Sequence, residues 1–349
     1  MRRQFRFVTL VLLIVIASYA LDVRSQQSGG RPYAYIPETV SPEWQERLRS
    51  MEDPGKGPVA PAPHDPAVWK TVRKSLDDRT VPATQAALRL FAPMVNERTL
   101  GNVPVLEITP KGWRKDKRLV VYTHHGAYTM FSARSTLSTS ALFAHSTQLR
   151  VISIDYTPAP EGNWRTIPDQ VVAVFKALKA QGYAMKNIVF FGDSAGGGLA
   201  AGATLKLRDE GTGIPGALVL WSPWADITET GDTYQTLKGA DPMLSYPKGL
   251  KIAADAYAAP KDQKHPYVSP VYGDFKKGFP PTLIQVGTKE ILLSTAVRLY
   301  QAIESAGGTA KLDVYEGMPH LFQHQLPQSP ESQLAMRKVK QFVDRYLKR

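Results

Sequence analysis

The sequence contains no cysteine in 349 residues. Disulfide bonds, thiolate metal sites and lipid-modified cysteine are therefore excluded. Export to an oxidising compartment would oxidise no thiol in such a chain. With 43% hydrophobic and 21% charged residues, the composition also lacks the bias of a disordered chain or of a multispanning membrane protein. The length is sufficient for one large α/β domain with insertions.

Acidic residues are fewer than basic ones, which leaves a formal charge of +12. The basic residues are scattered along the chain and no nucleic-acid-binding motif accompanies them. We therefore expect a solvated basic surface and no nucleic-acid partner.

The N-terminus has the order of a signal peptide. Arg2, Arg3 and Arg6 precede an uncharged apolar run over 7–17, and Ser18 and Ala20 place small residues at the positions that signal peptidase inspects. We expect residues 1–20 to be removed, leaving an exported protein, periplasmic or secreted, with no stable membrane span. The alternative is an uncleaved anchor, although the run is shorter than the roughly 20 residues that span a bilayer.

Residues 21–98 are expected to form a linker and N-terminal cap helices. The stretch 25–66 is rich in Pro, Gly and Ser, and helical patterns occur at 42–48 and at about 65–90. No strand is expected before about residue 99.

From residue 99 to 349, short apolar runs alternate with amphipathic segments. This alternation predicts an α/β fold with a mostly parallel central sheet flanked by helices. A proline-rich insertion at about 227–281 interrupts it, with a helix expected near 246–258. The predicted strands are 103–108, 119–123, 151–156, 188–191, 217–220, 282–286 and 312–315, and the predicted helices are 134–148, 167–181, 195–210, 290–306 and 331–347.

The strongest motif is G-x-S-x-G at Gly192, Ser194 and Gly196. It follows a predicted strand and precedes a helix rich in Ala and Gly. A serine in such a sharp turn is held clear of the sheet as a nucleophile, and the flanking glycines avoid clashes with the neighbouring elements. A glycine-rich phosphate-binding turn is the alternative, but the strand and helix on either side favour a nucleophile elbow.

A serine nucleophile needs a base, and in this architecture the base follows it in the chain. The five histidines other than His320 and His324 lie in proline-rich loops, in a helical pattern or before the serine. His320 follows the last predicted strand and is the expected base. His324 is a weaker candidate, and the two together make a poor zinc motif because no acidic third ligand is near them in the sequence.

The expected acid is Glu290, which follows the strand at 282–286. A carboxylate there can hold the imidazole in the required tautomer and stabilise its protonated form. Glu290 as a helix-capping residue is the structural alternative, and Asp226 is the reserve acid.

These motifs resemble those of the hormone-sensitive-lipase-like α/β-hydrolases, whose bacterial members carry G-D-S-A-G at the serine and H-G-G-[GA] upstream. The resemblance covers roughly 100–349 and implies an α/β-hydrolase fold with a helical cap over an acyl pocket. It places His124 as a loop-shaping residue and the backbone amides of Gly126, Ala127 and Ala195 in an oxyanion hole. Tyr128 falls on the family's following aromatic.

Two positions depart from the family. Glu290 stands where aspartate is usual, and His125 replaces the first glycine of the upstream motif. The backbone at His125 must therefore have an ordinary negative φ, or its ring must point away from the pocket.

The function expected is an exported serine carboxylesterase that cleaves short- to medium-chain acyl esters through an acyl-enzyme. A lactone hydrolase with the same three residues is the nearest alternative, followed by a catalytically inactive binding protein and then a metallohydrolase. No cofactor and no metal are expected. An edge strand near the C-terminus makes a homodimer possible.

Overall fold

The computed structural model describes residues 35–56 and 59–347. The expected signal peptide lies outside these ranges. Within them, every helix is too short or too polar to cross a membrane.

The centre of the fold is an eight-stranded sheet with the strand order β1-β2-β4-β3-β5-β6-β7-β8. Strands β3 to β8 run parallel, whereas β1 pairs antiparallel with β2, and β2 antiparallel with β4. The mostly parallel sheet is confirmed. The strands are β1 (Met94–Leu100), β2 (Val103–Thr109), β3 (Leu119–Thr123), β4 (Arg150–Ile154), β5 (Ile188–Asp193), β6 (Ala217–Trp221), β7 (Thr282–Gly287) and β8 (Ala310–Tyr315).

Strand β1 differs from the expectation that no strand precedes residue 99. Most of its residues are exposed, and it includes the polar sequence Asn96-Glu97-Arg98-Thr99, so it lacks the apolar pattern of a buried strand. It is held instead by antiparallel pairing with β2. A tight turn at Gly101 and Asn102, both of which have positive φ, connects the two strands. Pairing across a hairpin specifies such an edge strand more than hydrophobicity does.

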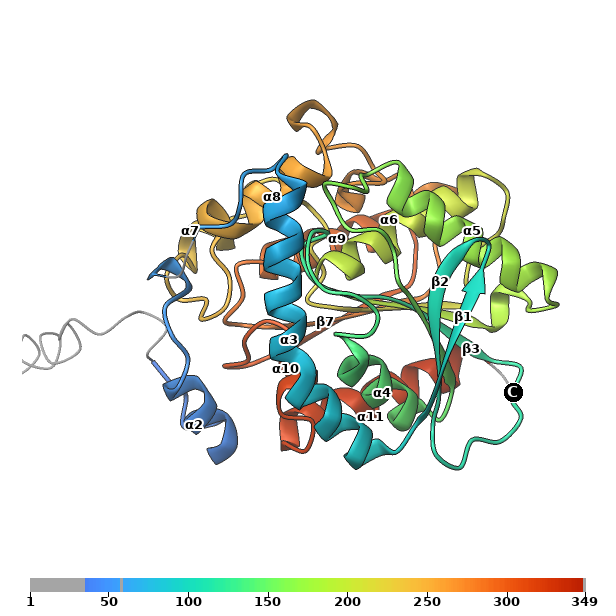
Figure 1. The fold of residues 1–349 in the computed structure, drawn as a ribbon, viewed down its shortest axis with the longest axis horizontal. Coiled ribbons are helices and arrows are strands. Elements are labelled where there is room, and N and C mark those ends of the chain that lie inside the picture. Colours follow the sequence, from blue (N-terminus) through green and yellow to red (C-terminus); the bar gives the residue numbers. More distant parts are fainter. Residues whose placement is uncertain (1–34, 57–58, 348–349) are drawn as a thin grey trace, which may run out of the picture.

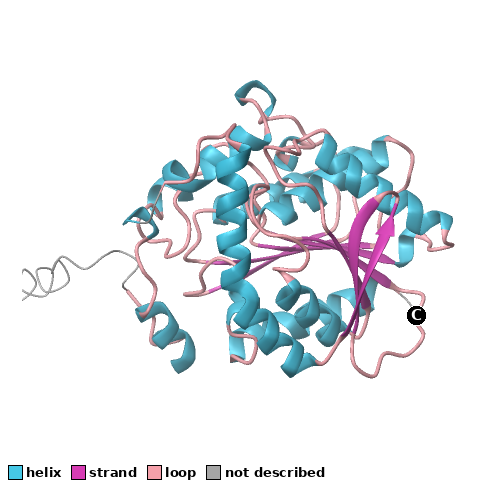
Figure 2. Cartoon of the chain, in the orientation of Figure 1, coloured by secondary structure: helices cyan, strands magenta, loops and turns pink. Residues whose placement is uncertain are grey.

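Helices cover both faces of the sheet, as Figure 2 shows. On one face α4 (Leu137–Thr147) and α11 (Pro330–Tyr346) pack on side chains such as Val120 and Phe191. On the other face α5 (Thr166–Ala180), α6 (Ala195–Asp209) and α9 (Leu293–Ser305) pack on side chains such as Val121 and Phe190. Adjacent residues of one strand thus enter opposite cores, as the two-residue period of a strand requires.

The N-terminal segment forms α2 (Pro42–Arg49), η2 (Pro54–Lys56) and α3 (Pro66–Phe91), close to the predicted helices. Asp65 is the N-cap of helix α3, and its side chain accepts a hydrogen bond from the Val68 N–H. The helix extends across the molecule to pack on α4 (Figure 1). The insertion contains α7 (Thr233–Thr236), η4 (Tyr246–Leu250) and α8 (Lys251–Tyr257), the last two at the predicted helical position. The remaining short elements are η3 (Met185–Asn187), η5 (Pro260–Asp262), η6 (Pro270–Tyr272), η7 (Phe275–Lys277) and α10 (Phe322–Gln325).

The first turn of α6 lies against the end of β3. A Cβ atom added at Gly196 would be 2.0 Å from the Thr123 carbonyl oxygen and 2.5 Å from that of His124. The Thr123 hydroxyl also donates to the Gly196 carbonyl, at 2.8 Å. Only glycine allows this approach, because both obstructing atoms belong to the backbone.

Gly196→Ala is therefore expected to lower the free energy of unfolding by more than about 3 kcal/mol, or to prevent folding, because backbone must shift to admit the methyl group. Gly249→Ala is the matched control, since an added Cβ there meets no atom within 4 Å and the residue is helical. It should be neutral, or stabilising by about 0.5–1 kcal/mol. Urea unfolding of both variants measures the difference, and similar losses in the two would contradict the packing described.

Candidate active site

Ser194 stands in the turn between β5 and α6. Its backbone angles, φ 55° and ψ −123°, lie in a strained region for a residue with a side chain. The turn is held by its own backbone, since the Ser194 N–H donates to the Trp221 carbonyl at 2.8 Å and the Ser194 carbonyl accepts from the Trp224 N–H at 2.8 Å. The 15-residue helix α6 begins directly after Ser194, so its positive N-terminal end faces the hydroxyl.

A continuous chain of hydrogen bonds connects the three residues predicted to act together. The His320 Nε2 lies 2.9 Å from the Ser194 Oγ, and the His320 Nδ1 lies 2.8 Å from the Glu290 Oε2. All three side chains are buried. Because a carboxylate accepts but does not donate, Nδ1 carries the ring proton and Nε2 is free to accept the serine proton.

Glu290 is positioned by a second set of contacts. Its Oε1 accepts from the Ser222 hydroxyl at 2.8 Å and from the Gly287 N–H at 2.6 Å. The Ser222 Oγ also accepts from the Leu321 N–H at 3.2 Å, so one hydroxyl joins the acid to the loop that carries His320. The reserve acid Asp226 lies elsewhere, paired with Arg298 at 2.6 Å.

His124 fixes the direction of a peptide group in the upstream loop. Its Nδ1 donates to the His125 carbonyl at 2.7 Å, and its ring stacks on Tyr156 at 4.2 Å. Burial lowers the pKa of His124 to about 4, so the ring is neutral at neutral pH and its single proton lies on Nδ1. In a planar trans peptide the N–H points opposite to the carbonyl, so this bond also sets the direction of the Gly126 N–H.

The next peptide is fixed by a tight turn. The Gly126 carbonyl accepts from the N–H groups of Thr129 and Met130, at 3.0 and 2.8 Å, which orients the Ala127 N–H in the opposite direction. Gly126 has φ 122°, Ala127 φ 51° and Tyr128 φ 64°. Among the described residues, no atom accepts a hydrogen bond from the Gly126 or Ala127 N–H. The Ala195 N–H lies in the first turn of α6, where no intrahelical acceptor exists.

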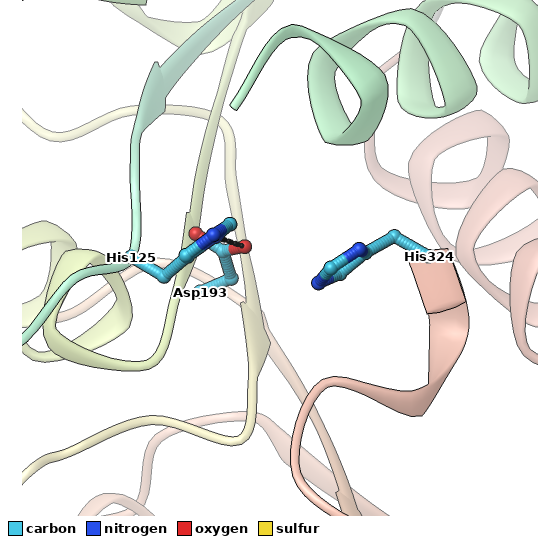
Figure 3. Close-up of side chains that lie close together, drawn as sticks. All are labelled: His125, Asp193 and His324. Carbon is cyan, nitrogen blue, oxygen red and sulfur yellow. Dashed lines mark hydrogen bonds and ion pairs between the residues drawn. The ribbon is translucent and has the colours of Figure 1, made fainter. Parts of the chain in front are cut away.

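His125, the position left open by the sequence, has an ordinary negative φ. Its Nδ1 lies 2.8 Å from the Asp193 Oδ2, and its ring lies parallel to that of His324, with 5.4 Å between centroids. Figure 3 shows His324 facing this pair from α10. One ligating atom from each of the three residues lies within 4.8 Å of the others, so this group could hold a metal ion.

Both the N-terminal helix and the insertion contact the loop that carries Gly126 and Ala127. On α3, the Arg73 Nη1 donates to the Thr129 carbonyl at 3.3 Å and to the Ala159 carbonyl at 3.2 Å. On α8, the Tyr257 ring stacks on Tyr128 with 3.7 Å between centroids.

The aromatic side chains of Trp44, Trp69 and Tyr257 are all buried. The Trp44 Nε1 donates to the Ser329 Oγ at 2.9 Å, and Trp44 packs on Phe322. Trp44 is thus part of a packed core.

Sequence reasoning missed Ser222 and Asp241. The Asp241 carboxylate is buried and accepts from three backbone N–H groups, those of Met243 and Leu244 at Oδ1 and that of Ile291 at Oδ2. It thereby ties the insertion to the residue after Glu290. No motif marks either residue; the end of β6 at Trp221 is the only signal that could have pointed to Ser222.

The profile of the alpha/beta hydrolase fold matches residues 120–324, well over half of the chain. An acetyl-hydrolase of Streptomyces hygroscopicus is 32% identical over 271 residues, covering 77% of this chain and 89% of that protein. An esterase of Acinetobacter venetianus is 32% identical over 265 residues, covering 75% and 87%.

Solved structures give the same result. One esterase is 30% identical with a TM-score of 0.84, covering 92% of this chain and 99% of that one. An esterase from the bacterial hormone-sensitive lipase family is 31% identical with a TM-score of 0.70, covering 78% and 98%. The chain therefore belongs to the α/β-hydrolases, in their hormone-sensitive-lipase-like group, and the predictions of that fold and of an enzyme acting on carboxylic esters are confirmed.

Burial raises the pKa of the Asp241 carboxyl from 3.8 to about 6, against the opposing effect of its N–H donors and of His320. Between these two pH values the folded state binds a proton that the unfolded state does not, so this group stabilises the fold as the pH falls. The test compares the unfolding free energies of the wild type and of Asp241→Asn. Their difference, wild type minus variant, should be roughly 1–3 kcal/mol larger near pH 4.5 than near pH 7.5. Urea titrations at both pH values measure it, and an equal or reversed difference would contradict the burial of this carboxyl.

Proposed function

We propose that the protein is a serine carboxylesterase that hydrolyses short- to medium-chain acyl esters through an acyl-enzyme intermediate. One observation carries the proposal. The Ser194 hydroxyl, the His320 ring and the Glu290 carboxylate form an unbroken hydrogen-bonded chain at the carboxyl edge of the sheet. That arrangement supplies a nucleophile, its base and the group that orients the base.

In the proposed acylation, the Ser194 Oγ attacks the ester carbonyl carbon while the His320 Nε2 takes the hydroxyl proton. The tetrahedral intermediate collapses when His320 returns that proton to the leaving alcohol oxygen, which breaks the carbon–oxygen bond and leaves an acyl-serine. Water then attacks the acyl carbon, and His320 first accepts its proton and then returns it to the serine oxygen. Glu290 stays ionised and stabilises the imidazolium in both halves.

The negative oxygen of each tetrahedral intermediate would be held by the N–H groups of Gly126, Ala127 and Ala195. Two observations support this role. His124 and the turn at Gly126 fix the directions of the Gly126 and Ala127 N–H groups, and neither of these N–H groups has an acceptor among the described residues. Fixed donors stabilise an oxygen whose charge increases in the transition state, and loss of one typically costs about a hundredfold or more in kcat.

The names of the relatives, esterase and acetyl-hydrolase, support a carboxylesterase and do not favour the lactone alternative. The same names, with all three reacting residues present, argue against a catalytically inactive binding protein. A metallohydrolase is not needed to account for the Ser194 site, since the hydrogen-bonded chain supplies both nucleophile and base.

Three further features are proposed from the sequence. Residues 1–20 would be a cleaved signal peptide that exports the protein, which the N-terminal sequence of the mature chain would test. The helices within residues 21–98 and the insertion at 227–281 would form the cap, supported by the contacts of Arg73 and Tyr257 with the loop that carries Gly126. A homodimer would form through β8, an edge strand of the sheet, and would appear as a doubled mass in light scattering.

Ser194→Ala should remain folded and lose at least about a thousandfold in kcat for a p-nitrophenyl ester, because no other group supplies the nucleophile. Glu290→Gln should lose roughly 10²–10⁴-fold, because an amide can no longer hold the proton on Nδ1. Steady-state kinetics measure both, with circular dichroism to confirm folding. Full activity in Ser194→Ala would refute the serine mechanism, and full activity in Glu290→Gln would remove Glu290 as the acid.

Across p-nitrophenyl esters of increasing acyl length, kcat/KM should be highest among short to medium chains and fall for long ones. Lactones of matched carbon number should be hydrolysed more slowly, because the two relatives are named as an acetyl-hydrolase and an esterase rather than as lactone hydrolases. Initial rates measured with protein lacking residues 1–20 give both comparisons. A higher kcat/KM for any lactone than for the best ester would replace the carboxylesterase proposal with a lactonase.

A further inference from the structure

A second group of reactive side chains lies beside the proposed catalytic residues but outside their hydrogen-bonded chain. It consists of His125, Asp193 and His324, which come from the loop after β3, the end of β5 and helix α10. In Figure 3 the two rings and the carboxylate converge on one space from different sides. The proposed ester chemistry assigns no role to any of them.

The donor types suit a divalent transition metal. Two imidazole nitrogens and one carboxylate oxygen form a common three-residue set for zinc, with a fourth position left for water. Ligand atoms about 2.1 Å from a tetrahedral ion lie roughly 3.4 Å from one another. In the structure one atom from each residue lies within 4.8 Å of the other two, and the His125 Nδ1 and Asp193 Oδ2 are 2.8 Å apart.

Side-chain movements separate this arrangement from a closed site. The His125 and Asp193 atoms would part by about half an ångström as a metal replaces the shared proton. The His324 nitrogen would approach by up to about 1.4 Å, and its ring would turn out of its parallel arrangement with His125. His324 is carried on a four-residue helix rather than on a long packed one. Neither ring nitrogen of His324 has a hydrogen-bond partner among the described residues, so nothing there competes with an ion.

The surrounding contacts resemble those that support metal ligands. The Tyr122 hydroxyl donates to the Asp193 Oδ1 at 2.8 Å, which fixes the carboxylate and leaves Oδ2 directed at His125. Tyr122 is itself buried and stacks on Phe191. Phe131 packs its ring edge-to-face with His125, at 5.2 Å. Partners of this kind orient ligands before the ion arrives.

We propose that His125, Asp193 and His324 bind one divalent transition-metal ion, with Zn²⁺ as the reference ion. Asp193 precedes Ser194, His125 precedes Gly126, and His324 follows His320 by four residues. A bound ion would therefore join three segments that carry the proposed catalytic groups. Binding to the folded state alone also raises its stability by mass action.

The test is a titration of the chelator-treated, full-length protein with Co²⁺, whose visible absorption reports coordination by nitrogen and oxygen ligands. The wild type should give bands that saturate at one ion per chain and disappear on addition of Zn²⁺, and Zn²⁺ should raise its Tm. No ester is present, so the result is independent of whether Ser194 is a nucleophile.

His324→Gln and His125→Gly should each weaken binding at least about tenfold, the lower bound for loss of even an outer partner of a metal site. His145→Gln is the matched control, because His145 is an exposed histidine on α4, and it should bind as the wild type does. Circular dichroism shows whether each variant is folded. If His125→Gly does not fold, His324→Gln alone still tests the proposal. Absence of Co²⁺ bands in the wild type, or equal binding by His324→Gln and His145→Gln, would overturn the proposal.

Discussion

The close approach of the first turn of α6 to the end of β3 is the contact on which the rest of the site depends. Gly196 lets two backbone segments meet where any side chain would strike the carbonyls of Thr123 and His124. That contact sets the distance between the nucleophile turn and the loop that follows β3. Because both segments end parallel strands of one sheet, their positions come from the core rather than from the groups that would react.

Buried contacts with no part in bond making direct the remaining groups. His124 is neutral and serves as a hydrogen-bond donor that turns a peptide, while Tyr257 and Arg73 attach the insertion and α3 to the same loop. Movement of either element would disturb the N–H groups proposed to hold the oxyanion. The cap proposed here is thus coupled to the chemistry through packing, and it need not contribute a reacting residue.

The sequence predicted most of the fold because its information is local. Apolar runs marked seven of the eight strands, and the G-x-S-x-G spacing marked the turn at Ser194. Strand β1 was missed because hairpin pairing, not hydrophobicity, holds it. The roles of Ser222, Asp241 and His324 could not be predicted from the sequence, since each contacts at least one residue that is far away in the chain.

In the proposed mechanism Ser194 becomes covalently acylated during turnover. Rapid acid quenching of the protein with an excess of p-nitrophenyl ester, followed by intact-mass and peptide mass spectrometry, would detect this acyl-enzyme. We expect an added mass of one acyl group per chain, located on the peptide that contains Ser194 and absent from His320→Ala. Turnover without any acylated protein, or an acyl group on another residue, would contradict it.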